Sequence, residues 1–139
     1  EIALQLDILN NEVFVVLGVD LNPSAPEMIT NVNTETQAVV TTTTQTTLQN
    51  LSNSNTIAVS SLSIQANPTQ AVSFSRAAEE SYTGALDYIG IIATNNFFVA
   101  IQGTGNVAAR NVTGRLWGYR AKADSSTYAA LVQSEVLSA

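Results

Sequence analysis

An alternation of apolar and polar residues with a period of two is the feature that most constrains how this chain folds. Side chains of a strand point to opposite faces in turn, so this period is typical of a strand with one buried face. The first segment, residues 2–8, carries its apolar residues at Ile2, Leu4, Leu6 and Ile8. Asn10 and Asn11 favour a turn, because asparagine tolerates a positive φ. The pattern then resumes at residues 13–21, so we expect two strands joined by a short turn.

The second segment is apolar at every odd position, which predicts one continuous buried face. These residues are Val13, Val15, Leu17, Val19 and Leu21. Phe14 and Val16 are apolar on the opposite face, so we expect the strand to be covered on both sides at its start. Pro23 and Pro26 end it, because proline cannot donate to a sheet ladder.

The rest of the chain continues this extended pattern between turn residues. We expect further strands at residues 57–64, 72–74, 88–93, 97–102 and 107–122. The threonine-rich residues 36–47 favour a strand or a stretched loop, because β-branched side chains disfavour helix. We also expect a register change near Ser60 and Ser61. Alanine and glutamate predict a short helical turn at residues 76–82.

The tail has two interpretations. Asp124 or Ser125 could cap a helix, or residues 123–139 could form an extended arm. One stripe of the helix would hold Tyr128, Leu131, Val132, Glu135 and Val136. The whole pattern predicts about eight strands and at most two short helices, which is typical of an all-β antiparallel β-sandwich, with a jelly roll as the expected topology. We expect one domain over residues 1–139, in which residues 1–9 or 123–139 can act as an arm.

Composition excludes most catalytic chemistry. The chain has no cysteine and no histidine, which removes thiolate nucleophiles and the commonest general base. Lys122 is the only lysine, and the nearest approach to a glycosidase pair is Glu79, Glu80 and Asp87, with no motif around them. No Asp-x-Asp spacing supports a calcium site. We expect a protein that is not an enzyme and that holds no cofactor or metal.

Charge and hydropathy bear on the partners. The formal net charge is −6, so we expect no direct nucleic-acid partner. The longest apolar run, residues 13–19, is much shorter than the roughly 20 residues of a membrane-spanning helix, and the start shows no signal-peptide pattern. We therefore expect no membrane partner. Asn50 and Asn111 each begin an N-glycosylation triplet, although Asn111 falls within an expected strand.

Charged residues are distributed unevenly along the chain. All five basic residues lie after residue 75, four of them within residues 110–122, whereas residues 36–75 carry no charge. A free monomer normally keeps mixed charges on its surface. The uncharged block therefore favours a surface that neighbouring molecules cover. The alternative is that serine, threonine, asparagine and glutamine supply enough polarity on their own.

Residues 110–122 are the strongest candidate for a binding surface. The candidate interface residues are Arg110, Thr113, Arg115, Trp117, Tyr119, Arg120 and Lys122. Tryptophan, tyrosine and arginine anchor interfaces, because each combines a large apolar area with a polar group. Three roles stay open for Trp117: a core residue, a protein contact, or a platform that stacks on sugars or bases.

Opposite charges in the two halves would also let identical copies meet head to tail or in a ring. The acidic first half of one copy would face the basic residues 110–122 of the next. On this hypothesis, replacing Arg115 and Arg120 by glutamate disrupts assembly and leaves the fold intact.

The last hairpin resembles that of small phage virion proteins. It reads Phe-Phe-Val-Ala-Ile at residues 97–101, Gly-Thr-Gly-Asn at 103–106 and Val-Thr-Gly-Arg-Leu-Trp-Gly-Tyr-Arg at 112–120. In particular, it resembles the jelly-roll decoration (cement) proteins of tailed-phage capsids. This resemblance implies a homo-oligomeric structural protein on the virion surface, without enzymatic activity. Its partners would be other copies of itself and a major capsid protein.

Two other functions fit the sequence. The first is a subunit of an extracellular filament or pilus, in which a donor strand of one copy completes the sandwich of the next. The exchanged residues would be Ile2, Leu4, Leu6 and Ile8. In a capsid-surface protein, residues 2–8 would pair inside their own domain. The second is a carbohydrate-binding module on a tail or cell surface, which requires Trp117 and Tyr119 to be exposed in a groove.

Overall fold

The computed structural model describes residues 1–76, 78–81 and 88–137. Its strands are β1 (Ile2–Ala3), β2 (Glu12–Pro23), β3 (Thr34–Thr41), β4 (Thr56–Ala66), β5 (Ala71–Arg76), β6 (Ala78–Ser81), β7 (Gly90–Ile92), β8 (Asn96–Thr104) and β9 (Val112–Lys122). A 3₁₀ helix, η1 (Ile8–Asn10), precedes β2, and an α-helix, α1 (Ser125–Leu137), follows β9.

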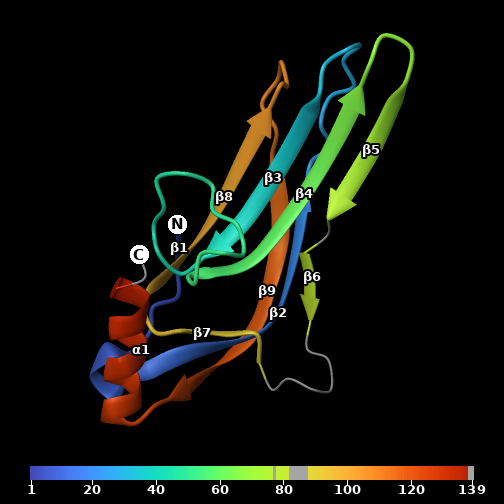
Figure 1. Ribbon diagram of the computed structural model, residues 1–139. Coiled ribbons are helices and arrows are strands. Elements are labelled where there is room, and N and C mark those ends of the chain that lie inside the picture. The colour runs from blue at the N-terminus through green and yellow to red at the C-terminus, as the bar shows by residue number, and fades with distance from the viewer. Residues whose placement is uncertain (77, 82–87, 138–139) are drawn as a thin grey trace.

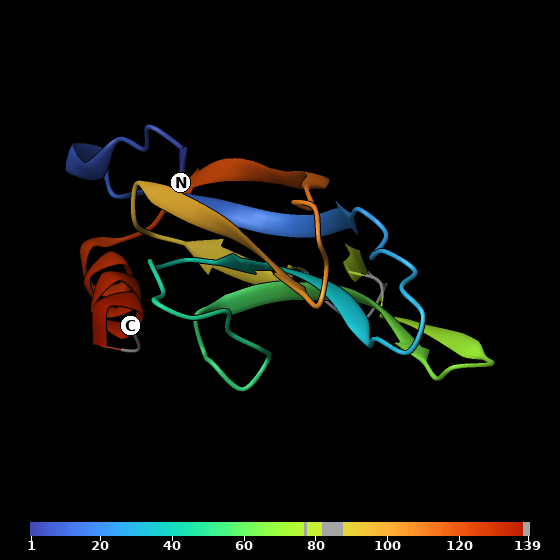
Figure 2. The same cartoon turned by 90° about the horizontal axis from the view of Figure 1, so that it is seen from above.

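The strands form two antiparallel sheets that pack face to face (Figures 1 and 2). Sheet A has the order β1-β8-β3-β4-β5, and sheet B has β2 at its centre, with β9 on one side and β6 and β7 on the other. The expected all-β antiparallel sandwich is confirmed. β3, β4 and β5 follow one another in sheet A as a meander, which is where the order differs from a regular jelly roll built of two Greek keys.

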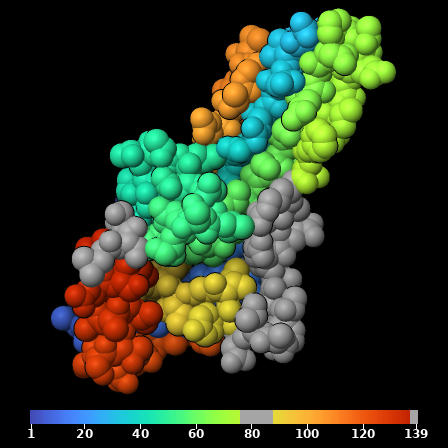
Figure 3. Space-filling view, in the orientation of Figure 1, coloured from blue at the N-terminus to red at the C-terminus, as the bar shows by residue number. Residues whose placement is uncertain are grey.

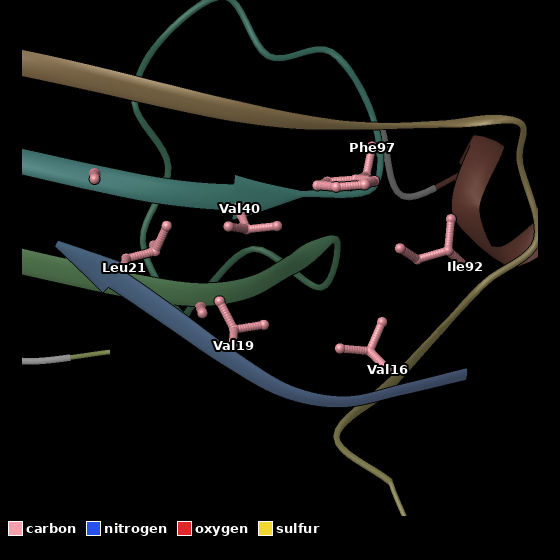
Figure 4. Packing of buried hydrophobic residues seen from close by; sticks show 8 residues of the cluster. Val16, Val19, Leu21, Val40, Ile92 and Phe97 are labelled. Carbon is pink, nitrogen blue, oxygen red and sulfur yellow. The ribbon is translucent and has the colours of Figure 1, made fainter. Parts of the chain in front are cut away.

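A core of small and medium apolar side chains lies between the sheets. Its buried members are Val16, Val19, Leu21, Ala38, Val40, Ala58, Ile92 and Phe97. Figure 4 shows the side chains of β2 pointing toward Val40 of β3 and Phe97 of β8. Val19 and Leu21 of β2, and Ala38 and Val40 of β3, lie at alternate positions of their strands, so the period-two pattern places each pair on one face.

A β-bulge at Leu17 changes which face of β2 is buried. The β2–β9 register shifts between Val16 and Gly18. An extra residue in one strand reverses the alternation beyond it. Val16 therefore shares the inner face with Val19. The single face expected over residues 13–21 is wrong, but the start of the strand is covered on both sides, as predicted.

Helix α1 covers the second face of β2. Tyr128, Leu131 and Val132 pack against Val13 and Val15 in a smaller core. Burial of these apolar side chains stabilises the helix far more than its intrinsic propensity does. Of the two interpretations of the tail, the structure therefore has the helix, docked on its own sandwich (Figure 1).

The start of α1 is capped by a side chain. The Thr127 N–H donates to Oδ1 of Asp124 over 2.7 Å, which satisfies one of the free donors of the first turn. The backbone hydrogen bond from Thr127, together with side-chain hydrogen bonds from Thr127 and Ser126, lowers the pKa of the Asp124 carboxyl from its ordinary value of 3.8. The cap was one of two positions expected from the sequence.

Three expected elements differ in the structure. Residues 78–81 form β6, which pairs with β2, so tertiary pairing overrides helix propensity there; residues 77 and 82 of the expected helical turn lie outside the described residues. The register change in the β3–β4 pair lies at Ile57 and not at Ser60 and Ser61. The last long strand begins at Val112, because residues 105–111 form a loop.

Candidate interaction surface

The outer face of β9 is an exposed strip of aromatic and polar side chains. Val112 and Leu116 pack against the core between the sheets, and every second residue from Thr113 to Tyr119 lies on the opposite, outer face. The outward residues are Thr113, Arg115, Trp117 and Tyr119. Trp117 is 49% exposed and Tyr119 is 52% exposed. The interpretation of Trp117 as a core residue is therefore wrong, and a protein contact or a stacking platform remains.

Two glycines allow β9 to lie close to β2. A Cβ atom at Gly118 would lie 2.2 Å from the Val15 carbonyl oxygen, and one at Gly114 would lie 2.7 Å from the Asp20 carbonyl oxygen. Real Cβ atoms do not approach backbone this closely, so only glycine fits these positions as they stand. The two glycines therefore let β9 pair closely with β2 along the strip.

Arg110 is used inside the fold. Its Nη1 donates to the Ala25 carbonyl over 3.1 Å, and its Nη2 lies 3.4 Å from Oε1 of Glu27. Glu27 also accepts hydrogen bonds from the N–H groups of Val107 and Ala108. Arg110 and Glu27 therefore tie the loop before β9 to the segment after β2.

Arg120 is also used inside the fold. Its Nη1 donates to Oε1 of Glu12 over 2.9 Å and to the Gln5 carbonyl over 3.0 Å, and its Nη2 donates to the Leu4 carbonyl over 2.6 Å. Gln5 has a φ of +55°, which ends the extended conformation begun at β1. Arg120 thus holds the first segment at its bend, and replacing it would disturb the fold as well as any contact surface.

The proposed exchange strand is short and pairs within its own domain. Ile2 and Ala3 pair with β8, and the Leu4 N–H donates to the Asn95 carbonyl over 2.8 Å. The Leu6 N–H donates to the Asn95 side chain. Leu6 is buried and Leu4 is partly buried, whereas Ile2 and Ile8 are exposed.

Arg115 and Lys122 differ from the other two bases of the strand. Within the described residues, neither side chain makes an ion pair. Arg115 lies opposite Asp20 in the β2–β9 register, and both side chains border an open hollow of about 410 Å³. Asn22, Thr113, Gly114 and Trp117 complete its wall. The hollow therefore presents an aromatic face beside one acid, one base and two neutral polar groups.

Asp20 and Asn22 are the members of this surface that sequence reasoning missed. Their signal is the polar side of β2 after Gly18, where Val19 and Leu21 alternate with them. The bulge at Leu17 was not predicted. The sequence alone therefore could not place Asp20 and Asn22 on the face of sheet B that carries Arg115 and Thr113.

A second feature is a mainly apolar groove between the edges of β8 and β9. Its volume is about 370 Å³. Val99 of β8 and Leu116 of β9 form its sides, and Ile2 lies at one part of its wall. The two sheets therefore do not close completely along this side of the sandwich.

Across residues 1–76, 78–81 and 88–137, no group of three or more acidic residues lies close enough together to hold a metal ion. None of the helices in these ranges is long and apolar enough to cross a membrane. Asn50 is exposed in a loop, and Asn111 lies just before β9 and not within it, where its N–H donates to the Ser24 hydroxyl.

Comparison with known proteins gives no relative. No protein-family model, no curated protein and no solved structure matches the chain.

Proposed function

We propose that this chain is a structural protein of a virion, a capsid decoration protein that stabilises the shell by protein–protein contacts. The observation that carries the proposal is the exposed strip on β9, in which Trp117, Tyr119 and Arg115 share the outer face of the strand, and Arg115 has no ion pair among the described residues. Surfaces with exposed aromatic residues and arginine are suited to protein contacts. The partners would be a major capsid protein and other copies of the chain, at the virion surface, with no catalytic step.

The first segment favours this function over a donor-strand filament. In such a filament the segment would pair with a neighbouring copy, whereas Ile2, Leu4 and Leu6 are all hydrogen-bonded within their own domain. Arg120 adds two further hydrogen bonds to the carbonyls of this segment. Moving the segment to a neighbour would break these contacts before new ones form.

A binding experiment with virus shells tests the proposal. Virus shells isolated from the biological source of the chain are stripped of bound protein, mixed with the purified chain, and sedimented. We expect the wild type to sediment with the shells and the variant Trp117→Ala/Tyr119→Ala to bind at least tenfold more weakly, because aromatic anchors contribute about 2 kcal/mol or more each to interfaces. Leu9→Ala is the matched control, since Leu9 is exposed elsewhere on the molecule.

Failure of the wild type to bind shells, or equal binding by the double variant, would contradict the proposal. Circular dichroism of each variant checks that it is folded. Neither aromatic side chain belongs to the core, so both replacements are expected to leave the fold intact.

The hollow beside Trp117 favours carbohydrate binding as the second candidate function. An aromatic ring stacks on the apolar face of a sugar, while Asp20, Asn22 and Arg115 can hydrogen-bond its hydroxyls. A glycan array separates the two functions. Binding by the wild type that is lost in Trp117→Ala, without binding to shells, would favour this candidate.

A further inference from the structure

Sheet A ends in two edges that no described strand covers. Among the described strands, β5 pairs only with β4, and β8 pairs only with β3 once it has passed Phe97, the last residue opposite β1. Figure 3 shows the β4–β5 hairpin projecting at one end of the molecule. Free strand edges present unpaired N–H and C=O groups and are natural sites of pairing with another chain.

The backbone groups of both edges can be assigned. In antiparallel pairs, residues bond to the neighbouring strand and away from it in turn. The Asn67 N–H donates to the Gln70 carbonyl. Every second residue of β5 counted from Gln70 therefore bonds to β4, and the backbone groups of Ser73 and Ser75 point away from β4. The Leu4 N–H donates to the Asn95 carbonyl, and the same count directs Val99, Ile101 and Gly103 toward the open edge of β8.

The two edges match in direction. β8 is antiparallel to β3, β3 to β4, and β4 to β5. β5 and β8 of one molecule are therefore antiparallel. If a second copy lies beside the first in the same orientation, its β8 edge meets β5 of the first as an antiparallel pair. This pairing would continue the antiparallel order of sheet A into the second copy.

The two edges also match in pleat. Ser73 pairs with Ile64 and, through the β3–β4 register, shares its face with Thr34, Thr36 and the core residue Ala38. Ile101 lies opposite Ala38. On both edge strands, the residues whose backbone groups point away from the sheet therefore carry their side chains on the same face. The pleats of the two strands would match when the strands pair.

Along the residues that would pair, neither edge carries the features that normally prevent such pairing. Natural edges are protected by charges, prolines or bulges. Residues 71–75 and 97–104 contain no charged residue and no proline, and the one charged residue of β5, Arg76, is its last. Val72 and Phe74 are 55% and 54% exposed. These side chains would lie next to Phe98 and Ala100 on the outer face of the neighbouring sheet.

We propose that β5 of one copy pairs with β8 of the next, so that sheet A continues from molecule to molecule. The occupant of each edge is a second copy, because one molecule presents both halves of an uncharged, antiparallel, in-phase pair. The contact is heterologous, so it closes into a ring or continues as a row. This inference rests on the structural role proposed above but uses a different surface, and the strand added to β8 also borders the groove beside β9.

Cysteine cross-linking tests the pairing directly, because the natural chain has no cysteine. Ser73→Cys is mixed under mild oxidation with Ile101→Cys, and separately with Val99→Cys to cover the neighbouring register. We expect a disulfide-linked dimer in one mixture or both, and none from any single variant alone. Within one molecule, β5 and β8 are three strand spacings apart, about 14 Å, so the double variant Ser73→Cys/Ile101→Cys should form a ladder of linked copies and no internal disulfide.

Two outcomes would overturn the inference. One is the absence of a mixed dimer in both mixtures. The other is self-linking by a single variant, which would indicate a two-fold contact between identical edges. Sedimentation velocity supplies an independent measurement: Ser73→Pro removes one outward N–H and should abolish the assembly, whereas the control Ser73→Ala should retain it. Ser73→Pro that assembles like wild type would also contradict the pairing.

The experiment separates this inference from the proposed function. Cross-linking without binding to virus shells would leave the edge pairing in place and remove the virion role. Binding to shells that Trp117→Ala weakens, without any cross-link between β5 and β8, would keep the virion role and remove the edge pairing.

Discussion

At the scale of single residues, glycine decides how closely β9 approaches β2. A side chain at Gly118 would overlap the Val15 carbonyl and the ring of Phe14, and Gly118 lies next to the bulge in the register. Gly90 provides a contrast, because a Cβ atom there would meet only Ile57 at 4.0 Å. The two positions therefore differ in packing and not in residue type.

We expect Gly118→Ala to destabilise the fold by about 1–3 kcal/mol, the usual cost of forcing an extra group into a packed site. The matched control, Gly90→Ala, should change the free energy of unfolding by less than about 1 kcal/mol. Urea denaturation of both variants measures the difference. Equal stability of the two variants would show that β9 can move away from β2 without cost.

Trp117 illustrates what sequence reasoning could and could not predict at this scale. Period two correctly separated Thr113, Arg115, Trp117 and Tyr119 from Val112 and Leu116. It could not tell which of the two faces is covered, because that depends on where sheet A lies. The roles of the four bases of residues 110–122 were equally hidden. Arg110 and Arg120 form ion pairs with residues far away in the sequence, and Arg115 and Lys122 form none among the described residues.

At the scale of elements, α1 depends on its cap and on its apolar contacts. Asp124 caps the first turn, and Tyr128 and Leu131 pack in the smaller core against Val13 and Val15 of β2. Glu135 is buried, and its Oε1 accepts the Ala93 N–H over 2.8 Å. The helix is thus attached to β2 through side chains and to the chain after β7 through one hydrogen bond.

The cap makes part of the stability of α1 dependent on pH. A carboxyl whose pKa is lowered by folding adds stability that is complete above its unfolded value, here 3.8. This stability declines as the pH falls and is absent below the folded pKa. We therefore expect Asp124→Ala to be less stable than wild type at about pH 6 and to approach wild type at about pH 2.5. Chemical denaturation at both pH values measures the effect.

Asp20→Ala is the matched control, since it removes an exposed acid for which the described residues show no ion pair. Its difference from wild type should change little over the same pH range. If the deficit of Asp124→Ala stayed constant down to acid pH, the ionised cap would not be the source of the stability.

Elements were predicted best where local pattern alone determines them. β2 and β8 were located from apolar spacing and turn residues, whereas the helix was one of two interpretations of the tail and Asp124 one of two expected caps. β6 was missed, because residues 78–81 favour helix locally and become a strand only through pairing with β2. The bulge at Leu17 was missed for a related reason, since nothing in the local sequence requires an extra residue there.

At the scale of the whole molecule, the uneven charge has an internal explanation in part. Glu12 and Glu27 of the first half bind Arg120 and Arg110 of the second half. The uncharged residues 36–75 are also partly covered by the chain itself, because Val39 and Val40 of β3 are buried. Attraction between copies would then depend on Arg115 and Lys122, the two bases of β9 with no ion pair among the described residues.

We expect Arg115→Glu/Lys122→Glu to weaken binding between copies while leaving the fold intact. Exposed ion pairs contribute about 0.2–1 kcal/mol each, so loss of two pairs should raise the dissociation constant by about 2- to 30-fold, with a smaller effect at high salt. Sedimentation velocity at two salt concentrations measures it. The charge-conserving variant Arg115→Lys/Lys122→Arg is the control, and unchanged self-association in the glutamate variant would remove charge from the account of assembly. Arg120→Glu is unsuitable for this test, because Arg120 holds the first segment.

The pairing of β2 with β9 has a consequence for folding during synthesis on the ribosome. It joins Glu12 to Lys122 at one end and Pro23 to Val112 at the other, and both cores contain residues of β2. During synthesis, β2 therefore leaves the ribosome long before its main partner exists. Contacts between such distant residues form slowly, and unpaired apolar strands aggregate readily. Nascent chains that end before β9 should be the stage at which this protein needs a chaperone most.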